Sequence, residues 1–192
     1  MQEDYYVLER SGPSSYPLLE WDQSGSLFRK GTAVAVTAPI RLRLGAPVPR
    51  SPVMVDHHSL PEPVVSARIR DVLEPLGLYG VQLVPADVKI DDGDSRRFWL
   101  LHVYCRLKCM DMKKSVCRFY PSGSVLSIEK LVLDERTLEE IPLERRLLFV
   151  LAESTSVYIC HRSIVDTVLA VAPQGLRFVP VEQWNEGAGF QG

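Results

Sequence analysis

The 192-residue sequence has neither a long apolar run nor an excess of charge of one sign. Its longest apolar run, Leu147–Ala152, has six residues, whereas a membrane helix needs about 18. The 22 basic and 24 acidic residues give a net charge of −2, which leaves no electrostatic footprint for nucleic acid or anionic lipid. The N-terminus places Glu3 and Asp4 where a signal peptide carries basic residues. The sequence therefore predicts a cytoplasmic protein without direct nucleic-acid or membrane contact.

Cysteine is also scarce, with four residues and no C-x-x-C pair, so the spacing favours neither a disulfide framework nor a zinc site. Cys105 and Cys109 continue an apolar face that recurs at every second position from Trp99 onward. The opposite face carries polar residues, including His102. We interpret the cysteines as reduced core residues. No metal and no cofactor are predicted.

The sequence lacks the catalytic motifs that identify an enzyme from one chain, namely G-x-S-x-G, the Walker loop, the dinucleotide fingerprint and H-E-x-x-H. The prediction is therefore a non-enzymatic protein without catalytic residues. One local cluster of acid–base side chains, Asp56-His57-His58, lies in the proline-rich segment Ala46–Ser59, which we expect to be a loop. The alternative hypothesis is a small-ligand-binding protein or an enzyme that uses this segment or His102.

The chain does have the composition of a globular protein, with 46% apolar and 24% charged residues. Residues 1–60 are rich in proline and predict short strands at Asp4–Arg10 and Ile40–Leu44. Residues 61–184 form the predicted main α+β domain. Residues 185–192 are predicted to be a flexible tail.

A weak internal repeat relates residues 64–85 to residues 159–180, at a shift of 95 positions. Each copy predicts a strand, a helix with an apolar stripe and a second strand that ends at a proline. Ser66 is the expected N-cap of the first helix, and Ser163-x-x-Asp166 resembles a capping box in the second.

Strand patterns outnumber helical ones between the two copies of the repeat. The predicted strands are Phe98–Lys108, Val116–Tyr120, Val125–Leu133, Leu147–Ala152 and Val157–Cys160. The fold class is therefore predicted as α+β, with a largely antiparallel sheet and two separated strand-helix-strand units.

Two acidic segments stand out from the otherwise balanced charge. They comprise Asp91, Asp92 and Asp94 in one turn, and Asp134, Glu135, Glu139 and Glu140 in a second run. A solvated surface is the plain interpretation. The sharper hypothesis is a negative surface that binds a basic partner, such as a toxin that acts on nucleic acid.

The order of these segments resembles a bacterial family of polymorphic-toxin immunity proteins, the myxobacterial-type immunity domain once catalogued as a domain of unknown function and encoded beside toxin genes. The resemblance covers roughly Leu60–Trp184. It rests on the segments Phe98–Tyr104, Cys109–Ser115, Val125–Leu133, Leu148–Glu153, Val157–Cys160 and Gly175–Pro180.

The resemblance implies a non-enzymatic α+β protein that binds and neutralises a toxin of its own cell, with roles in bacterial competition and kin discrimination. A homodimer is compatible with that role. Asp111 and Ser115 match the family's aspartate–serine step, and Gly175 and Phe178 match its closing glycine and aromatic residue; structural roles are implied for all four. The aromatic residues that suit partner contacts by type are Tyr5, Tyr6, Trp21, Tyr79, Tyr120 and Trp184.

Overall fold

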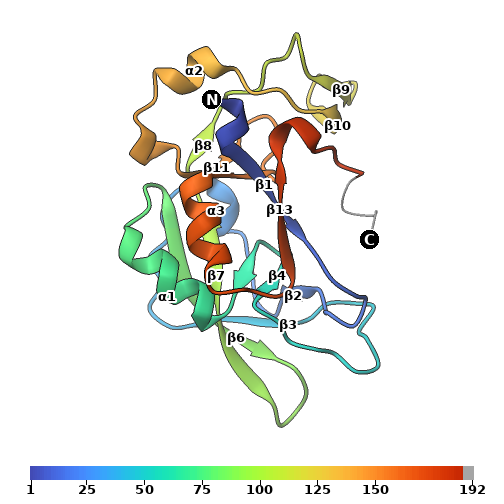
Figure 1. Cartoon of the computed structure of the whole chain (residues 1–192). Coiled ribbons are helices and arrows are strands. Elements are labelled where there is room, and N and C mark those ends of the chain that lie inside the picture. The colour runs from blue at the N-terminus through green and yellow to red at the C-terminus, as the bar shows by residue number, and fades with distance from the viewer. Residues whose placement is uncertain (188–192) are drawn as a thin grey trace.

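A computed structural model describes residues 1–187 of the protein and shows two curled sheets joined by long connections (Figure 1). The first sheet has five strands in the order β13-β1-β12-β11-β8. Its strands are β1 (Tyr5–Arg10), β8 (Arg106–Leu107), β11 (Leu148–Leu151), β12 (Tyr158–His161) and β13 (Leu176–Pro180). Strand β1 therefore lies inside this sheet although it begins at the fifth residue, and Tyr5 is fully buried.

The second sheet has six strands in the order β2-β3-β6-β7-β5-β4. Its longest pair, β6 and β7, runs in register from Val81 opposite Val103 to Lys89 opposite Ser95. The strands are β2 (Leu19–Trp21), β3 (Ile40–Leu44), β4 (His57–His58), β5 (Val64–Val65), β6 (Val81–Lys89) and β7 (Ser95–Val103).

The remaining elements are a separate hairpin, three short helices and several 3-10 turns. The hairpin consists of β9 (Val116–Phe119) and β10 (Val125–Lys130). The helices are α1 (Ala67–Leu73), α2 (Glu135–Glu139) and α3 (Arg162–Leu169). The 3-10 segments are η1 (Gln2–Asp4), η2 (Phe28–Lys30), η3 (Glu74–Leu76), η4 (Leu143–Arg145) and η5 (Val181–Gln183).

The α+β class is confirmed, but the prediction of a largely antiparallel sheet is wrong because each large sheet contains a parallel pair. Strand β8 runs parallel to β11, and β3 runs parallel to β6. Both pairs join segments far apart in sequence, where no hairpin turn dictates an antiparallel arrangement. The sheets are therefore mixed.

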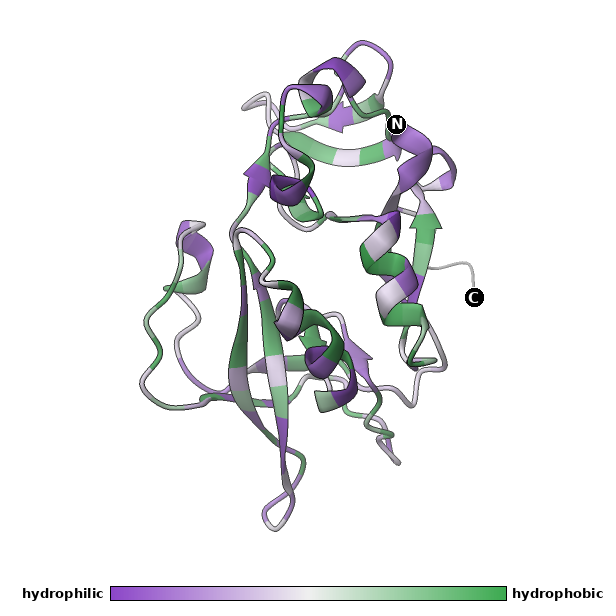
Figure 2. Cartoon of the chain, turned by 60° about the vertical axis from the view of Figure 1, so that its left-hand side comes forward, coloured by the Kyte–Doolittle hydropathy of each residue, from purple (hydrophilic) through white to green (hydrophobic). Residues whose placement is uncertain are grey.

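Both predicted strand-helix-strand units are present, one contributing to each sheet. The first is β5-α1-β6 and the second is β12-α3-β13, and helices α1 and α3 pack against each other. Figure 2 shows hydrophobic and hydrophilic residues alternating along both helices, as expected for amphipathic helices that cover a core.

The capping predictions need correction. Ser66 occupies the N-cap position of α1, but its hydroxyl donates to Asp56 Oδ1 at 2.7 Å instead of capping the helix. Helix α3 begins at Arg162, so Ser163 lies inside it, and the N-cap is His161, whose Nδ1 accepts from the Ser163 N–H. A capping box at Ser163 is therefore wrong.

Strand β7 separates two hydrophobic cores. The predicted apolar face is confirmed, since Leu101 and Val103 are buried in the larger core. The opposite face is buried too, because Phe98 and Leu100 belong to the smaller core. The predicted strand Phe98–Lys108 divides after Val103, where the N–H groups of Tyr104 and Cys105 both donate to Gly80 O.

The predicted domain boundary at residue 60 stays a prediction. The predicted tail, 185–192, falls largely outside the described residues; within them, Glu186 exchanges hydrogen bonds with the backbone of Ile128 in β10.

Candidate functional site

The two acidic segments lie at opposite ends of the molecule. Asp91, Asp92 and Asp94 form the tip of the β6–β7 hairpin, whereas Asp134, Glu135, Glu139 and Glu140 lie in and around α2 (Figures 1 and 2). Figure 2 also shows that the β6–β7 hairpin changes from hydrophobic near the body to hydrophilic at its tip. The fold therefore does not combine the seven residues into one negative surface.

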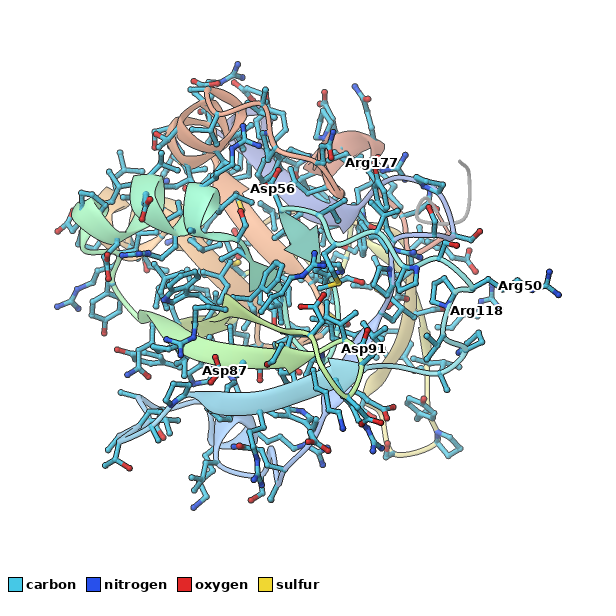
Figure 3. The ribbon with its side chains drawn as sticks, turned by 90° about the horizontal axis from the view of Figure 1, so that it is seen from below. Arg50, Asp56, Asp87, Asp91, Arg118 and Arg177 are labelled. Carbon is cyan, nitrogen blue, oxygen red and sulfur yellow. The ribbon has the colours of Figure 1, made fainter. Side chains whose placement is uncertain are left out.

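Neighbouring cations neutralise the hairpin acids. Asp92 Oδ1 lies 2.8 Å from Lys89 Nζ, and Asp94 Oδ2 lies 2.6 Å from Arg96 Nη2. These hydrogen bonds hold the pKa values of both carboxyl groups below their ordinary values. Asp91 Oδ1 instead accepts from the Gly93 and Asp94 N–H groups and shapes the turn. Figure 3 labels Asp91 and Asp87.

Two of the four acids around α2 also have local partners. Asp134 is the N-cap of α2, where its carboxylate accepts from the Thr137 N–H and hydroxyl. Glu135 lies 3.4 Å from the N-terminal ammonium group. Glu139 and Glu140 are exposed and form no ion pair within residues 1–187.

The family-motif residues occupy turns and packing positions. Asp111 Oδ1 accepts from the Lys113 and Lys114 N–H groups, and the Ser115 hydroxyl bridges to the N–H and C=O of Val132. These bonds fix the segment that leads into β9. Phe178 packs, half-buried, against the larger core. Gly175 has a φ of +90°, so its backbone conformation disfavours a side chain.

The Asp56-His57-His58 segment, which the alternative hypothesis selects, is buried rather than an exposed loop. Asp56 accepts from the Ser66 hydroxyl and from Arg68 Nη1 and the Gln174 N–H, at 2.7, 3.1 and 2.9 Å. Both carboxylate oxygens are therefore engaged in joining the two strand-helix-strand units. Figure 3 shows Asp56 beside α1 and β4.

The two adjacent histidines hold loops together. His58 Nδ1 donates to Pro17 O at 2.8 Å, and His57 Nδ1 donates to Gly175 O at 3.0 Å. The proton lies on Nδ1 in both rings because a carbonyl oxygen only accepts. Burial lowers the pKa of both rings, that of His57 to about 4, so both are neutral near pH 7. His57 Nε2 is buried and has no hydrogen-bond partner among the described residues.

His102 is buried between two acceptors. Its Nδ1 lies 3.1 Å from Glu62 Oε2 and its Nε2 lies 3.0 Å from Thr32 O. Burial alone lowers the pKa of His102, but the bonds to Glu62 and Thr32 outweigh it and raise the pKa above its ordinary value. When both ring nitrogens carry a proton, the ring donates to both acceptors. His102 therefore has a structural role.

A group of exposed apolar side chains lies on and beside the β9–β10 hairpin, and the sequence prediction missed it. We call this cluster the hairpin surface; it comprises Met112, Val116, Phe119, Tyr120 and Leu126, each 45–51% exposed. Burying such side chains in a complex is favourable by about 25 cal/mol per Å². Of the aromatic anchors proposed by residue type, Tyr120 belongs to this surface, whereas Tyr5 and Trp184 are buried.

The hairpin also has an unpaired edge and a basic rim. Strand β9 pairs only with β10 among the described strands, whereas β10 is joined to Glu186 on its other side. An apolar strand edge without a neighbour is a template for another strand. The exposed cations around it are Lys113, Lys114, Arg118 and Lys130, of which Arg118 pairs with Glu129 and Lys114 with Asp111.

The described residues contain neither a cluster of metal-ligand side chains that would hold an ion nor a helix able to cross a membrane. No curated protein matches the sequence. A model of the immunity protein family Imm11 matches residues 10–183, and the chain therefore belongs to this family. The match begins well before Leu60, where the sequence resemblance was expected to start.

Proposed function

We propose that this member of the Imm11 immunity family neutralises a toxin of the producing cell by stoichiometric binding, without catalysis. The observation that carries the proposal is the family match over residues 10–183. An inhibitor of this kind needs a rigid scaffold with a complementary surface and no activated nucleophile. The engaged carboxylate of Asp56 and the buried histidines are consistent with such a scaffold.

The hairpin surface is the proposed toxin contact. Its aromatic side chains, Phe119 and Tyr120, are 48% and 51% exposed, and the exposed Arg118 precedes them in the sequence. Aromatic residues and arginine are the side chains that most often dominate binding energy at protein interfaces. The other exposed apolar side chains among the described residues lie in loops, in 3-10 turns and in α3. This surface is therefore a better candidate than the acidic turn, in which Lys89 and Arg96 neutralise Asp92 and Asp94.

The chemistry of the hairpin surface specifies its partner. An apolar centre with a basic rim suits a toxin face that has an apolar patch flanked by aspartate or glutamate. The free edge of β9 allows the toxin to add a strand, in which case backbone hydrogen bonds supplement the side-chain contacts. A second copy of this chain is the rival occupant of that edge, and it would give a homodimer.

The biological setting is also part of the proposal. We place the protein in the cytoplasm, where it meets the toxin encoded by a neighbouring gene before export. In this setting it protects the producer and its kin during bacterial competition. The acidic segments would suit a basic, nuclease-type toxin, whereas the hairpin surface favours an acidic contact face whatever reaction the toxin catalyses.

Co-expression tests the proposal. The C-terminal domain of the toxin candidate is expressed alone, with the full chain, and with an unrelated Imm11 protein as the control. The expected result is growth arrest that only the full chain relieves, together with co-purification of a complex with a fixed stoichiometry. Relief without a complex would contradict binding, and unrelieved toxicity in the presence of the folded chain would contradict immunity to that toxin.

A further inference from the structure

The segment at residues 31–39 connects η2 to β3 and lies outside both sheets, and we call it the strap. Its two valines, Val34 and Val36, are half-buried against the smaller core, whereas Ala33 and Ala35 are exposed. This alternation is typical of a β-strand, yet the strap pairs with no strand among the described residues. None of its backbone groups forms a hydrogen bond with a backbone group elsewhere in the described chain. Side chains therefore hold the strap in place.

Two neighbouring side chains on β6 and β7 hold the middle of the strap. Gln82 and His102 are directly opposite each other in the register of these strands. The Gln82 side-chain amide bonds both backbone groups of Val34, with Oε1 2.8 Å from the amide nitrogen and Nε2 3.1 Å from the carbonyl oxygen. His102 Nε2 lies 3.0 Å from the carbonyl oxygen of Thr32. We call Gln82 and His102 the latch.

The two ends of the strap are fixed separately from the latch. Before the strap, Phe28 is buried in the smaller core, and Arg106 Nη2 donates to Arg29 O at 3.0 Å. Gly31 then turns the chain with a φ of +66°, a conformation that glycine adopts readily. After the strap, Ile40 begins β3 and is buried. Opening of the latch therefore frees only the residues between these two anchored ends.

The latch depends on the protons of the His102 ring. Because Nδ1 lies 3.1 Å from Glu62 Oε2, a doubly protonated ring donates to Glu62 and to Thr32 at the same time. A ring with one proton donates to only one of them. A hydrogen bond to a charged carboxylate is about twice as strong as one to a neutral carbonyl, so the remaining proton stays on Nδ1. The Nε2 lone pair then faces the Thr32 carbonyl oxygen, and this contact becomes repulsive.

The groups that face His102 favour the doubly protonated ring. Burial lowers the pKa of His102, its two hydrogen bonds raise the pKa, and Arg106 lowers it; the net pKa is above its ordinary value. Glu62 supplies the carboxylate among these neighbours. Phe28 and Tyr104 pack against the ring, with ring centroids 5.1 and 5.7 Å from that of His102. The strap itself contains no ionisable side chain, so the titration of His102 is what changes the latch.

We infer that Gln82 and His102 form a pH-sensitive latch, which keeps the strap closed while the His102 ring is doubly protonated and lets it open when the ring loses one proton. Opening exposes the half-buried sides of Val34 and Val36 and the part of the smaller core that they cover. The strap is thus a conformational switch that responds to alkaline pH. This inference concerns a part of the fold separate from the hairpin surface and stands whether or not the chain neutralises a toxin.

The test measures hydrogen exchange of the Val34 amide in the full chain by nuclear magnetic resonance. The Val34 N–H donates to Gln82 Oε1, so its protection reports whether the strap is closed. The readout is the protection factor, which corrects for the intrinsic dependence of exchange on pH. From about pH 6 to about pH 9, this factor is expected to fall at least about tenfold, with the same midpoint as the titration of the His102 ring.

Amides in the middle of β6 and β7 provide the internal reference. They should keep their protection over the same range, which separates opening of the strap from unfolding of the whole chain. A constant protection factor for Val34, or a fall with a midpoint different from that of His102, would overturn the inference. An equal loss of protection in β6 and β7 would overturn it as well.

Glu62→Gln tests the proton chemistry of the latch. With a neutral amide at position 62, a singly protonated ring can keep its proton on Nε2 for Thr32 O and accept a hydrogen bond at Nδ1. The strap should therefore stay closed, with the protection factor of Val34 at about pH 9 within about twofold of its value at about pH 6.

Glu9→Gln is the matched control for this variant. Glu9 is likewise a partly buried glutamate that accepts a hydrogen bond from an aromatic ring nitrogen, Trp184 Nε1, but it has no contact with the latch. Glu9→Gln should therefore lose Val34 protection at alkaline pH as the wild type does. A wild-type loss of protection in Glu62→Gln, or the absence of that loss in Glu9→Gln, would contradict the role of Glu62 in the latch.

Discussion

His57 and Gly175, which are 118 positions apart, are joined by a hydrogen bond of 3.0 Å from His57 Nδ1 to the glycine carbonyl. The same carbonyl accepts from the Ser11 N–H, so Gly175 connects β4, the end of β1 and the start of β13. The backbones of Gly175 and His57 also lie close together, because a Cβ atom added to Gly175 would be 2.5 Å from His57 O. This contact helps to hold the two sheets together.

Gly175→Ala is therefore expected to destabilise the protein more than a typical glycine substitution. The backbone of residue 175 has a φ of +90°, which disfavours a side chain, and the added Cβ would also clash with the His57 carbonyl. We expect the free energy of unfolding to fall by about 3 kcal/mol or more. Gly77→Ala is the matched control, since its φ is +54° with nothing within 4 Å of the new Cβ, and it should cost about 1 kcal/mol. Urea unfolding measures both, and equal losses would show that the His57 contact adds nothing.

The neutral, buried His57 predicts a loss of stability in mild acid. Its pKa is lowered from 6.5 to about 4 in the folded protein, so between these pH values the unfolded chain binds a proton that the folded chain does not. Stability is therefore lost as the pH falls through this window, on the order of 3 kcal/mol from this residue.

The control for this effect is His57→Asn, which keeps a donor near the position of Nδ1. Its free energy of unfolding should depend less on pH between about 6.5 and 4 than that of the wild type. Urea midpoints measured across this range provide the comparison. The same slope in both proteins would contradict a neutral His57.

The contribution of His102 to stability depends on pH in the opposite direction to that of His57. The folded pKa of His102 is raised above 6.5 by Glu62 and Thr32 against the effect of burial, so its contribution is fully present below the unfolded pKa and is lost as the pH rises through the folded pKa. Glu62→Gln removes the carboxylate partner and should flatten this alkaline loss. An unaltered slope above about pH 6.5 in Glu62→Gln would contradict the assignment.

The four cysteines should differ in reactivity. Cys105, Cys109 and Cys160 are buried, and burial raises the pKa of the Cys109 and Cys160 thiols to about 12. Cys117 in β9 is only partly buried. A thiol reagent at pH 8 should therefore modify Cys117 first and the other three only on unfolding. Mass spectrometry identifies the site, and early modification of Cys160 would contradict the packing.

Local patterns predicted much of the fold because local physics determines those features. The stripe at Ile164 and Val168 and the alternation through Leu101 and Val103 each identify a buried face, and the structure confirms both. The parallel pairing of β3 with β6 joins segments without a connecting turn, so no local pattern indicates its direction.

The candidate site was harder to predict because exposure depends on the whole fold. Tyr5 and Tyr120 are the same residue type, yet Tyr5 is fully buried and Tyr120 is 51% exposed. The short strand from Val116 was predicted, but its unpaired edge follows from the absence of a neighbour among the described strands. Likewise, the acidic turn is visible in the sequence, whereas the pairing of Asp94 with Arg96 requires the side-chain geometry.

The most direct test of the account is the dissociation constant of the purified chain and its toxin, measured for Phe119→Ser and Leu169→Ser. The two residues are 48% and 50% exposed, so both substitutions remove a similarly exposed apolar side chain. We predict that Phe119→Ser weakens binding at least about tenfold at unchanged stability, whereas Leu169→Ser in α3 has no effect. Equal affinities for both variants would contradict toxin binding through the hairpin surface.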